Sequence, residues 1–152
     1  MFVSGCSSRP KQTPAFMAAL SANLDHCTGQ QPVIFDAVKV NQGGLYDPVH
    51  GIFRTNVTGM YVFTATLSVS PHNSFHVAFV KNKADNVIGY IYTDIGNIWL
   101  KDSSTVLVHL DAGDEVWMVC LSESRIEDDY NHGIDGAQDY HSHIAGFLLS
   151  AD

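Results

Sequence analysis

Alternation of apolar and polar side chains is the dominant pattern in this chain. In the segment YVFTATLSVS (61–70), Tyr61, Phe63, Ala65, Leu67 and Val69 occupy every second position, and the positions between them hold mainly threonine and serine. Successive side chains of a β-strand point to opposite faces, so this pattern predicts a strand with one buried side. The same alternation predicts further strands in FHVAFV (75–80), VIGYIYT (87–93), TVLVHL (105–110), EVWMVCL (115–121) and HIAGFLL (143–149).

Turn-forming residues separate these segments. Asn, Asp, Gly and Pro favour the tight turns that connect antiparallel strands. They occur at Asp47-Pro48, His50-Gly51, His72-Asn73, Asn82 to Asn86, Gly96-Asn97 and Ala112-Gly113-Asp114. Short strands about 10 residues apart are typical of a sandwich or a barrel, so the predicted fold class is all-β.

The chain divides into a short first part and one domain. Residues 1–14 hold few apolar side chains, and Pro10 and Pro14 interrupt any regular element, so this part is interpreted as a leader or the remnant of a stem. Residues 15–152 form one domain without a linker or an internal repeat. Its first segment, AFMAALSANL (15–24), fits either an alternating strand or one face of a helix. Because strands surround this segment, we predict that it is the first strand.

An excess of acidic residues narrows the range of partners. The chain has 152 residues, with 16 Asp and Glu against 8 Lys and Arg, and its net charge is −8. It has no cluster of basic residues, so neither nucleic acid nor an anionic membrane surface is an expected partner. No apolar run approaches the ~18 residues that cross a bilayer, and the first residues lack the apolar stretch of a signal peptide. The chain is therefore either intracellular or the mature form of a secreted protein.

Three cysteines leave the disulfide pattern open. Cys120 lies between Val119 and Leu121 in a strand-like segment, so we expect a buried free thiol there. Cys6 and Cys27 lie in loop-like segments. They either pair with each other or leave Cys6 to link subunits through the leader.

Spaced aromatic residues make the fold prediction specific. With one Asn and one Gly they form a set of signature positions: Phe35, Asn41, Tyr46, Phe53, Gly59, Tyr61 and Phe63. This set resembles the pattern of the complement C1q globular head, except that Ala65 stands where the pattern ends in another aromatic residue. LDAGDEVWM (110–118) resembles the family's Leu-x-x-Gly-Asp-x-Val hairpin, and IAGFLL (144–149) resembles its closing strand, with Ile144 in place of Phe. The resemblance covers about residues 15–150.

The resemblance implies a ten-stranded jelly roll of two sheets, shared with tumour necrosis factor ligands. It also implies secretion and assembly into a homotrimer. Tyr61 and Phe63 would stack with Phe53 and Phe35 across neighbouring strands. At Gly59 a side chain would either collide with a neighbour or need a positive φ. No Gly-x-y repeat occurs, so this would be a head without a collagen stalk.

The main candidate for ligand binding is the acidic segment SESRIEDDYNHGIDGAQDYH (122–141). In the family's layout it is the long loop before the last strand, where three copies would gather many carboxylates that a cation would stabilise. Such oxygen ligands suit Ca²⁺, although the spacing differs from that of an EF-hand, and the alternative is a solvated loop that keeps the protein soluble. The predicted ligand-binding residues are Glu127, Asp128, Asp129, Tyr130, Asp135 and Asp139. Asp128, Asp129, Asp135 and Asp139 are also the candidate calcium ligands.

Other chemistry has little support in the sequence. His141 and His143 would share one face of a strand and suit zinc or copper, but no Glu follows them as it does in a cupin. The chain has no Gly-x-Ser-x-Gly, no phosphate-binding glycine loop and no His-Glu-x-x-His, so it is predicted not to be an enzyme. Asn56-Val57-Thr58 is a glycosylation sequon, which matters only in a secreted chain.

Two functions are consistent with the resemblance. The first is a secreted recognition protein whose trimeric head binds microbial glycans or other surface patterns by avidity, in a lectin-like role in innate immunity. The alternative is an extracellular signalling or structural protein that uses the same fold to engage a protein receptor or the matrix. Fold resemblance alone does not choose between the two.

Overall fold

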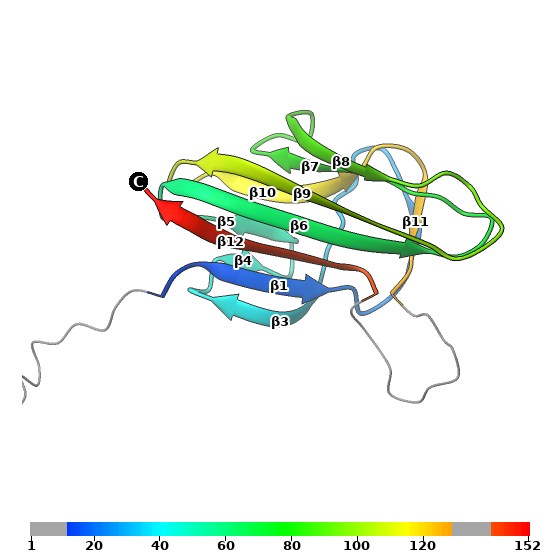
Figure 1. Cartoon of the computed structure of the whole chain (residues 1–152), viewed down its shortest axis with the longest axis horizontal. Coiled ribbons are helices and arrows are strands. Elements are labelled where there is room, and N and C mark those ends of the chain that lie inside the picture. Colours follow the sequence, from blue (N-terminus) through cyan, green and yellow to red (C-terminus); the bar gives the residue numbers. More distant parts are fainter. Residues whose placement is uncertain (1–11, 129–140) are drawn as a thin grey trace, which may run out of the picture.

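Two five-stranded sheets pack face to face in the structure (Figure 1). The computed structural model describes residues 12–128 and 141–152. The first sheet contains β1 (Ala15–Ala19), β3 (Ala37–Gln42), β6 (Gly59–Val69), β9 (Leu100–Leu110) and β12 (His143–Ala151). The second contains β4 (Tyr46–Asp47), β5 (Ile52–Arg54), β7 (His76–Lys81), β8 (Val87–Tyr92) and β10 (Glu115–Cys120). A small separate pair joins β2 (Leu24–Cys27) and β11 (Ser124–Ile126).

The order of the strands is that of a jelly roll. The first sheet runs β3-β1-β12-β6-β9 and the second β4-β5-β10-β7-β8, and all pairs are antiparallel. The predicted all-β class, with ten strands in two sheets, is therefore confirmed. The described residues form no helix, so none of them belongs to a helix that could span a membrane.

Every segment predicted from alternation forms a strand, with bounds that shift by one or two residues in most strands and by five residues in two places. β9 begins at Leu100 instead of at position 105, because it pairs with β6 along its whole length. The predicted first strand ends at Ala19, after five residues. There the chain turns, and the backbone N–H of Ser21 donates a hydrogen bond to Oδ1 of Asp36 at 2.9 Å.

Aromatic rings fill the space between the two sheets. The ring of Phe53 lies 5.7 Å from that of Tyr61 and 5.5 Å from that of Phe63, so these predicted contacts exist. They join the two sheets, however, and not neighbouring strands of one sheet, because Phe53 belongs to β5 and its partners to β6. Phe35 is buried but makes no ring contact with them among the described residues; Phe16 does so instead, 5.1 Å from Phe53.

Hydrogen bonds explain why the signature includes Asn41. Its side-chain Nδ2 donates to the carbonyl of Tyr46 at 2.9 Å, and its Oδ1 accepts from the backbone N–H of Tyr46 at 3.1 Å. This pair closes the turn that reverses the chain between β3 and β4. The buried hydroxyl of Tyr46 then donates to the carbonyl of Phe35 at 2.7 Å, and burial raises the pKa of this tyrosine. Polar groups at three signature positions thus have hydrogen-bond partners, those of Phe35 and Tyr46 inside the core and those of the part-buried Asn41 at its edge.

Gly59 is required by close backbone contact. A Cβ atom at this position would lie 2.3 Å from the carbonyl oxygen of Ser150 and 2.9 Å from Cα of Ala151. Both atoms belong to β12, whose register shifts between Leu148 and Ser150 opposite the start of β6. Of the two reasons considered for this glycine, collision is therefore the one that applies.

A disulfide joins Cys27 at the end of β2 to Cys120 at the end of β10. Both residues are fully buried, and their Cα atoms lie 5.8 Å apart. The expected burial of Cys120 is therefore confirmed, but the expectation of a free thiol there and the alternative of a Cys6–Cys27 bond are wrong. The reason is topological: β11 pairs with β2, and this brings the two cysteines together across 93 residues of sequence.

Replacing both Cys27 and Cys120 by Ala should lower the free energy of unfolding by about 2–5 kcal/mol, because the bond closes a long loop in the unfolded chain. Urea denaturation of the double variant and of the wild type, with and without reductant, measures this loss. Peptide mapping of the oxidised protein should recover a Cys27–Cys120 peptide. A peptide that joins Cys6 to Cys27 would contradict the assignment.

Candidate functional site

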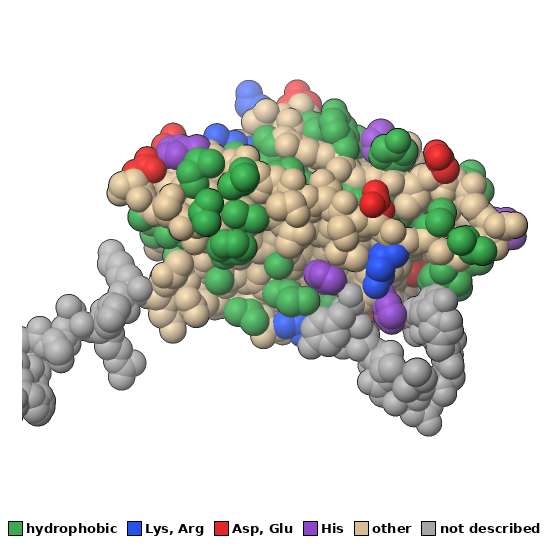
Figure 2. Space-filling view, in the orientation of Figure 1, with side chains coloured by type: hydrophobic (Ala, Val, Ile, Leu, Met, Phe, Trp, Pro, Cys, Tyr) green, Lys and Arg blue, Asp and Glu red, His purple; other side chains and the backbone are tan. Residues whose placement is uncertain are grey.

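Exposed apolar side chains gather on the outward face of the first sheet (Figure 2). Leu107 is 61% exposed, Leu149 56% and Phe147 43%. We call this group, together with the half-buried Met60 and Val62 beside it, the outer patch; its residues are Met60, Val62, Leu107, Phe147 and Leu149. A contiguous apolar area of this kind is uncommon on a monomeric soluble protein and usually marks a site of interaction.

The register of the strands brings these residues together. Phe147 of β12 lies opposite Val62 of β6, and Val62 lies opposite Leu107 of β9. All three side chains point outward, because their neighbours in sequence point into the core. Leu149 lies in the register shift between Leu148, opposite Tyr61, and Ser150, opposite Met60. The patch therefore crosses three adjacent strands and does not depend on any one of them.

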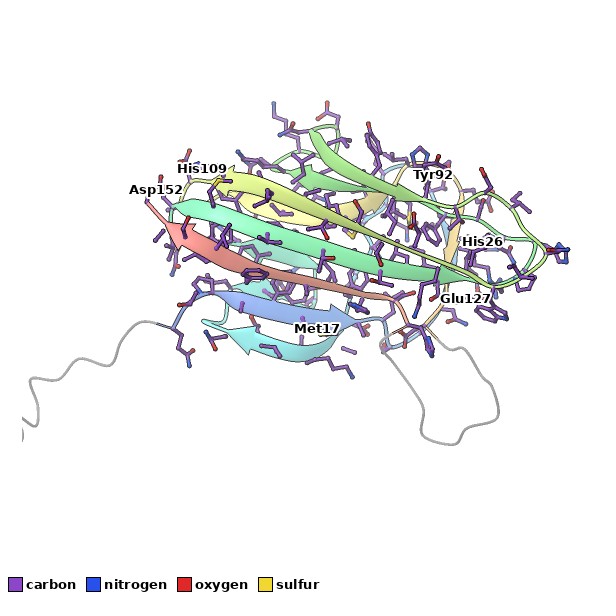
Figure 3. The ribbon with its side chains drawn as sticks, in the orientation of Figure 1. Met17, His26, Tyr92, His109, Glu127 and Asp152 are labelled. Atoms are coloured by element: carbon purple, nitrogen blue, oxygen red, sulfur yellow. A yellow bond between two sulfur atoms is a disulfide. The ribbon has the colours of Figure 1, made fainter. Side chains whose placement is uncertain are left out.

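Polar groups border the outer patch on two sides. At the end of the sheet near the C-terminus, Nε2 of His109 lies 2.8 Å from Oδ2 of Asp152 (Figure 3). Toward the other end, hydroxyl groups cover the same face: Thr66 and Ser103 are joined at 2.7 Å, and Thr105 donates to Thr64 at 3.2 Å. An apolar centre with a polar border is typical of a protein interface.

The acidic segment is only partly within the described residues. Of the six predicted ligand-binding residues, Asp129, Tyr130, Asp135 and Asp139 lie outside them. Glu127 and Asp128 lie inside, and both are 4% exposed. These two acids are therefore buried and do not belong to a solvated loop.

Glu127 is held by its own neighbours. Its Oε1 accepts a hydrogen bond from Nε of Arg125 at 2.7 Å, and this bond raises the pKa of the arginine. Nη1 of Arg125 also lies 3.3 Å from Oδ1 of Asp25. The other oxygen, Oε2 of Glu127, is buried without a hydrogen-bond partner in the part of the chain that the structure describes.

Asp128 connects the end of β11 to the start of β12. Its backbone N–H donates to Asn23 at 2.9 Å, and its Oδ1 accepts from the backbone N–H of Ser142 at 3.3 Å. Among residues 12–128 and 141–152, no three His, Cys, Asp or Glu side chains come close enough to hold a metal ion. Because three of the four candidate calcium ligands lie outside these ranges, calcium binding stays a prediction.

The remaining sequence candidates lie apart from one another. His141 precedes β12, in a bend, and only His143 lies in the strand, so the two do not form the expected pair on one strand face. Asn56 is exposed, and Oγ1 of Thr58 in the same sequon accepts a hydrogen bond from the backbone N–H of Ala112. The outer patch was not predicted from the sequence, although the outward side of the alternating strands offered a signal: Val62, Leu107 and Phe147 stand where polar residues are usual.

Comparison with known proteins places this architecture in a family. Residues 15–149 match the C1q domain. The chain belongs to the C1q domain family. It is 26% identical over 137 residues to human complement C1q and tumor necrosis factor-related protein 9A, a match that covers 89% of this chain and 38% of that protein. It is 30% identical over 143 residues to zebrafish (Danio rerio) Caprin-2, covering 91% of this chain and 14% of the relative. The chain thus spans less than half the length of these relatives.

Solved structures show the same fold. The globular domain of a zebrafish complement 1qA protein superposes with a TM-score of 0.68 at 19% identity, covering 92% of this chain and 99% of that one. Murine APRIL superposes with a TM-score of 0.65 at 11% identity, covering 90% and 99%. Eiger TNF of S. frugiperda superposes with a TM-score of 0.63 at 14% identity, covering 95% and 96%. This jelly roll is thus shared by a C1q globular domain and a tumour necrosis factor protein, as the sequence resemblance implied.

Replacing Glu127 by Gln should lower the free energy of unfolding by about 1–3 kcal/mol, since a neutral amide oxygen accepts the buried hydrogen bond from Arg125 less strongly than a carboxylate does. The control is Glu123→Gln, which changes an exposed acid beside His26 and should alter stability by less than about 0.5 kcal/mol. Urea denaturation in calcium and in a chelator measures both variants. If Glu127→Gln loses stability only in the presence of calcium, the main partner of Glu127 is Ca²⁺ and not Arg125.

Proposed function

We propose that this chain is the head of a secreted, non-enzymatic recognition protein that assembles into a homotrimer and binds microbial glycans or other surface patterns. The observation that supports it most is the outer patch, on a sheet of a C1q domain. A face that is apolar at its centre and polar at its border loses unfavourable contact with water when copies of the chain cover it. Closed rings of identical subunits are the usual result when one such face meets a different face of the next copy.

The buried disulfide supports secretion. Disulfides persist in oxidising compartments and are rare where glutathione and thioredoxin keep thiols reduced. The bond between Cys27 and Cys120 is fully enclosed and links the small β2–β11 pair to the second sheet. It therefore has the character of a structural bond and not of a reversible catalytic one.

Trimeric assembly supports recognition by avidity. A weak single site becomes useful when three copies meet a repetitive surface, because the first contact raises the effective concentration of the others. The acidic segment is proposed to contribute to this binding, with Ca²⁺ held by Asp129, Asp135 and Asp139 together with Asp128. The net charge of −8 favours cations at such a site.

The likeness to tumour necrosis factor ligands keeps a second function open. Murine APRIL and the Eiger TNF of S. frugiperda share the fold. A signalling or structural role would use the same trimer to engage a protein receptor or the matrix. A pull-down that returns one stoichiometric protein partner, together with no glycan binding, would favour this role.

The Leu107→Glu variant should be a monomer, because a trimer that covers the outer patch would bury the new charge without a partner. Light scattering coupled to size exclusion should give about three times 16.6 kDa for the wild type, and association of the variant should be at least about tenfold weaker. Val49→Glu is the matched control: it adds the same charge at an equally exposed apolar residue in the turn between β4 and β5. Equal masses for both variants would rule out the outer patch as the interface.

Binding to a panel of bacterial cells and glycan arrays tests recognition itself. We expect the wild type to bind at least one surface, and we expect a chelator or the combined Asp129→Asn, Asp135→Asn and Asp139→Asn substitutions to weaken that binding. Asp85→Asn, Asp94→Asn and Asp111→Asn together remove the same charge at exposed positions elsewhere and should have little effect. Failure to bind every surface would exclude pattern recognition.

A further inference from the structure

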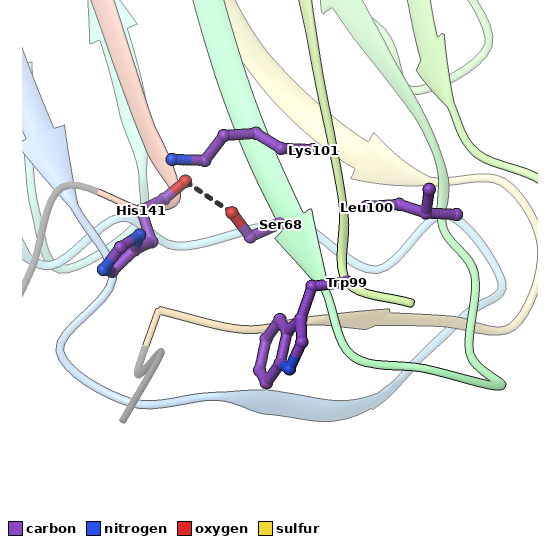
Figure 4. Close-up of a pocket in the computed structure, with 5 residues that line it drawn as sticks. All are labelled: Ser68, Trp99, Leu100, Lys101 and His141. Carbon is purple, nitrogen blue, oxygen red and sulfur yellow. Dashed lines mark hydrogen bonds between the residues drawn. The ribbon is translucent and has the colours of Figure 1, made fainter. Parts of the chain in front are cut away.

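A pocket lies on the same face of the first sheet as the outer patch but at the opposite end (Figure 4). Its volume is about 250 Å³, and it is lined by Ser68, Trp99, Leu100, Lys101 and His141. Four residues with hydroxyl groups separate the pocket from the outer patch: Thr64, Thr66, Ser103 and Thr105. A trimer built on the outer patch would therefore place three copies of this pocket near one end of the assembly.

The floor of the pocket is fixed by hydrogen bonds. Ser68 is 4% exposed, and its hydroxyl donates to the carbonyl of His141 at 3.0 Å. Its backbone N–H donates to Oγ of Ser142 at 3.0 Å, and that hydroxyl donates to the carbonyl of Glu127 at 2.6 Å. These bonds hold the end of β6 against residues 141 and 142, which precede β12. Ser68 and Lys101 lie opposite each other in the paired strands β6 and β9, which makes the shape of the pocket well defined.

The walls of the pocket differ in chemistry. Lys101 lies opposite Ser68 in the β6–β9 register, and Trp99 precedes it by two residues, so both side chains project on the same side of the chain. In Figure 4 the lysine, the indole of Trp99 and the imidazole of His141 surround Ser68. One side therefore offers an aromatic surface, and the other offers an ammonium group and an imidazole.

The charge of this lining is opposite to that of the chain. None of the five lining residues is acidic, although the chain has a net charge of −8. The side chain of Asp102 alternates to the other side of β9. Glu127 and Asp128 lie behind Ser142 and are buried, with their carboxylates bonded to Arg125 and to the backbone of Ser142. Lys101 is therefore the group in this lining that can pair with an anion, and no described carboxylate lines the pocket.

We propose that this pocket binds an acidic monosaccharide, a pyranose ring that carries a carboxylate. The carboxylate would pair with Lys101, the apolar face of the ring would lie on Trp99, and ring hydroxyls would bond to His141 and to the free lone pair of Ser68. The volume is smaller than that of a site for a drug-sized ligand and suits a single ring. This inference rests on the proposed glycan recognition, but it assigns a site and a ligand charge that differ from those of the acidic segment.

Glucuronate and glucose provide a matched pair of probes. They share one ring and differ only at its outer carbon, which is a carboxylate in glucuronate and a hydroxymethyl group in glucose. Trp99 reports binding by fluorescence in a Trp117→Phe background, which leaves one tryptophan in the chain. We expect glucuronate to give a saturable change in emission and glucose to bind at least about tenfold more weakly, as the loss of one charge-assisted hydrogen bond implies. Lys101→Gln should weaken glucuronate binding by a similar factor, whereas Lys83→Gln, in the exposed β7–β8 hairpin, should not.

Two results would overturn the assignment: equal affinity for glucuronate and glucose, or unchanged glucuronate affinity in Lys101→Gln. Failure of the pocket assignment can be distinguished from failure of the proposed glycan recognition. If cells and arrays are bound but neither Lys101→Gln nor excess glucuronate affects that binding, the pocket assignment falls and pattern recognition stands. If glucuronate binds at Lys101 but no cell or array is bound, pattern recognition falls and the pocket assignment stands.

Discussion

Contact between aromatic rings of opposite sheets is the constraint on which the rest of the molecule depends. Phe16 of the first sheet stacks on Tyr46 of the second at 4.6 Å, and Phe53 of the second sheet meets Tyr61 and Phe63 of the first. Because side chains alternate along each strand, fixing these rings inside also fixes which residues face outward. Val62, between two core aromatics, must then lie on the surface. The outer patch and the pocket therefore follow from how the core is filled.

The sequence predicted the fold well because its signal is local. Alternation and turn residues are properties of neighbouring positions, and they indicated every strand of six residues or more except the edge strand β3, while the spaced aromatics indicated how the strands pack. Pairing between distant segments was less accessible. The Cys27–Cys120 bond and the meeting of Phe53 with Phe63 across the sandwich depend on strand order, which the alternation pattern does not encode. The long β9 was also missed in part, since Lys101 to Ser104 are polar and only pairing with β6 makes them a strand.

The candidate site was harder to predict for a related reason. A run of acids suggests one shared site. Whether a carboxylate can bind a ligand, however, depends on the groups that already bond to it as much as on its charge. Glu127 follows Arg125 by two residues and accepts a hydrogen bond from its side chain. Asp128 instead accepts a hydrogen bond from the backbone N–H of Ser142. Neither pairing is visible in the order of residues 122–141. The pocket combines the end of β6, the start of β9 with the preceding Trp99, and His141 before β12, so its lining has no signature in any one segment.

The position of the final strand has a consequence for how the molecule forms. β12 lies between β1 and β6 in the middle of the first sheet, and Ile144 and Gly146 of this strand pack among the core rings. During synthesis, β1 and its early partner β3 emerge from the ribosome long before β12, so the side of β1 that β12 covers stays unpaired. The sheet closes only when residues 143–151 are released. A nascent chain of this protein therefore depends on protection from aggregation until translation of the domain is finished.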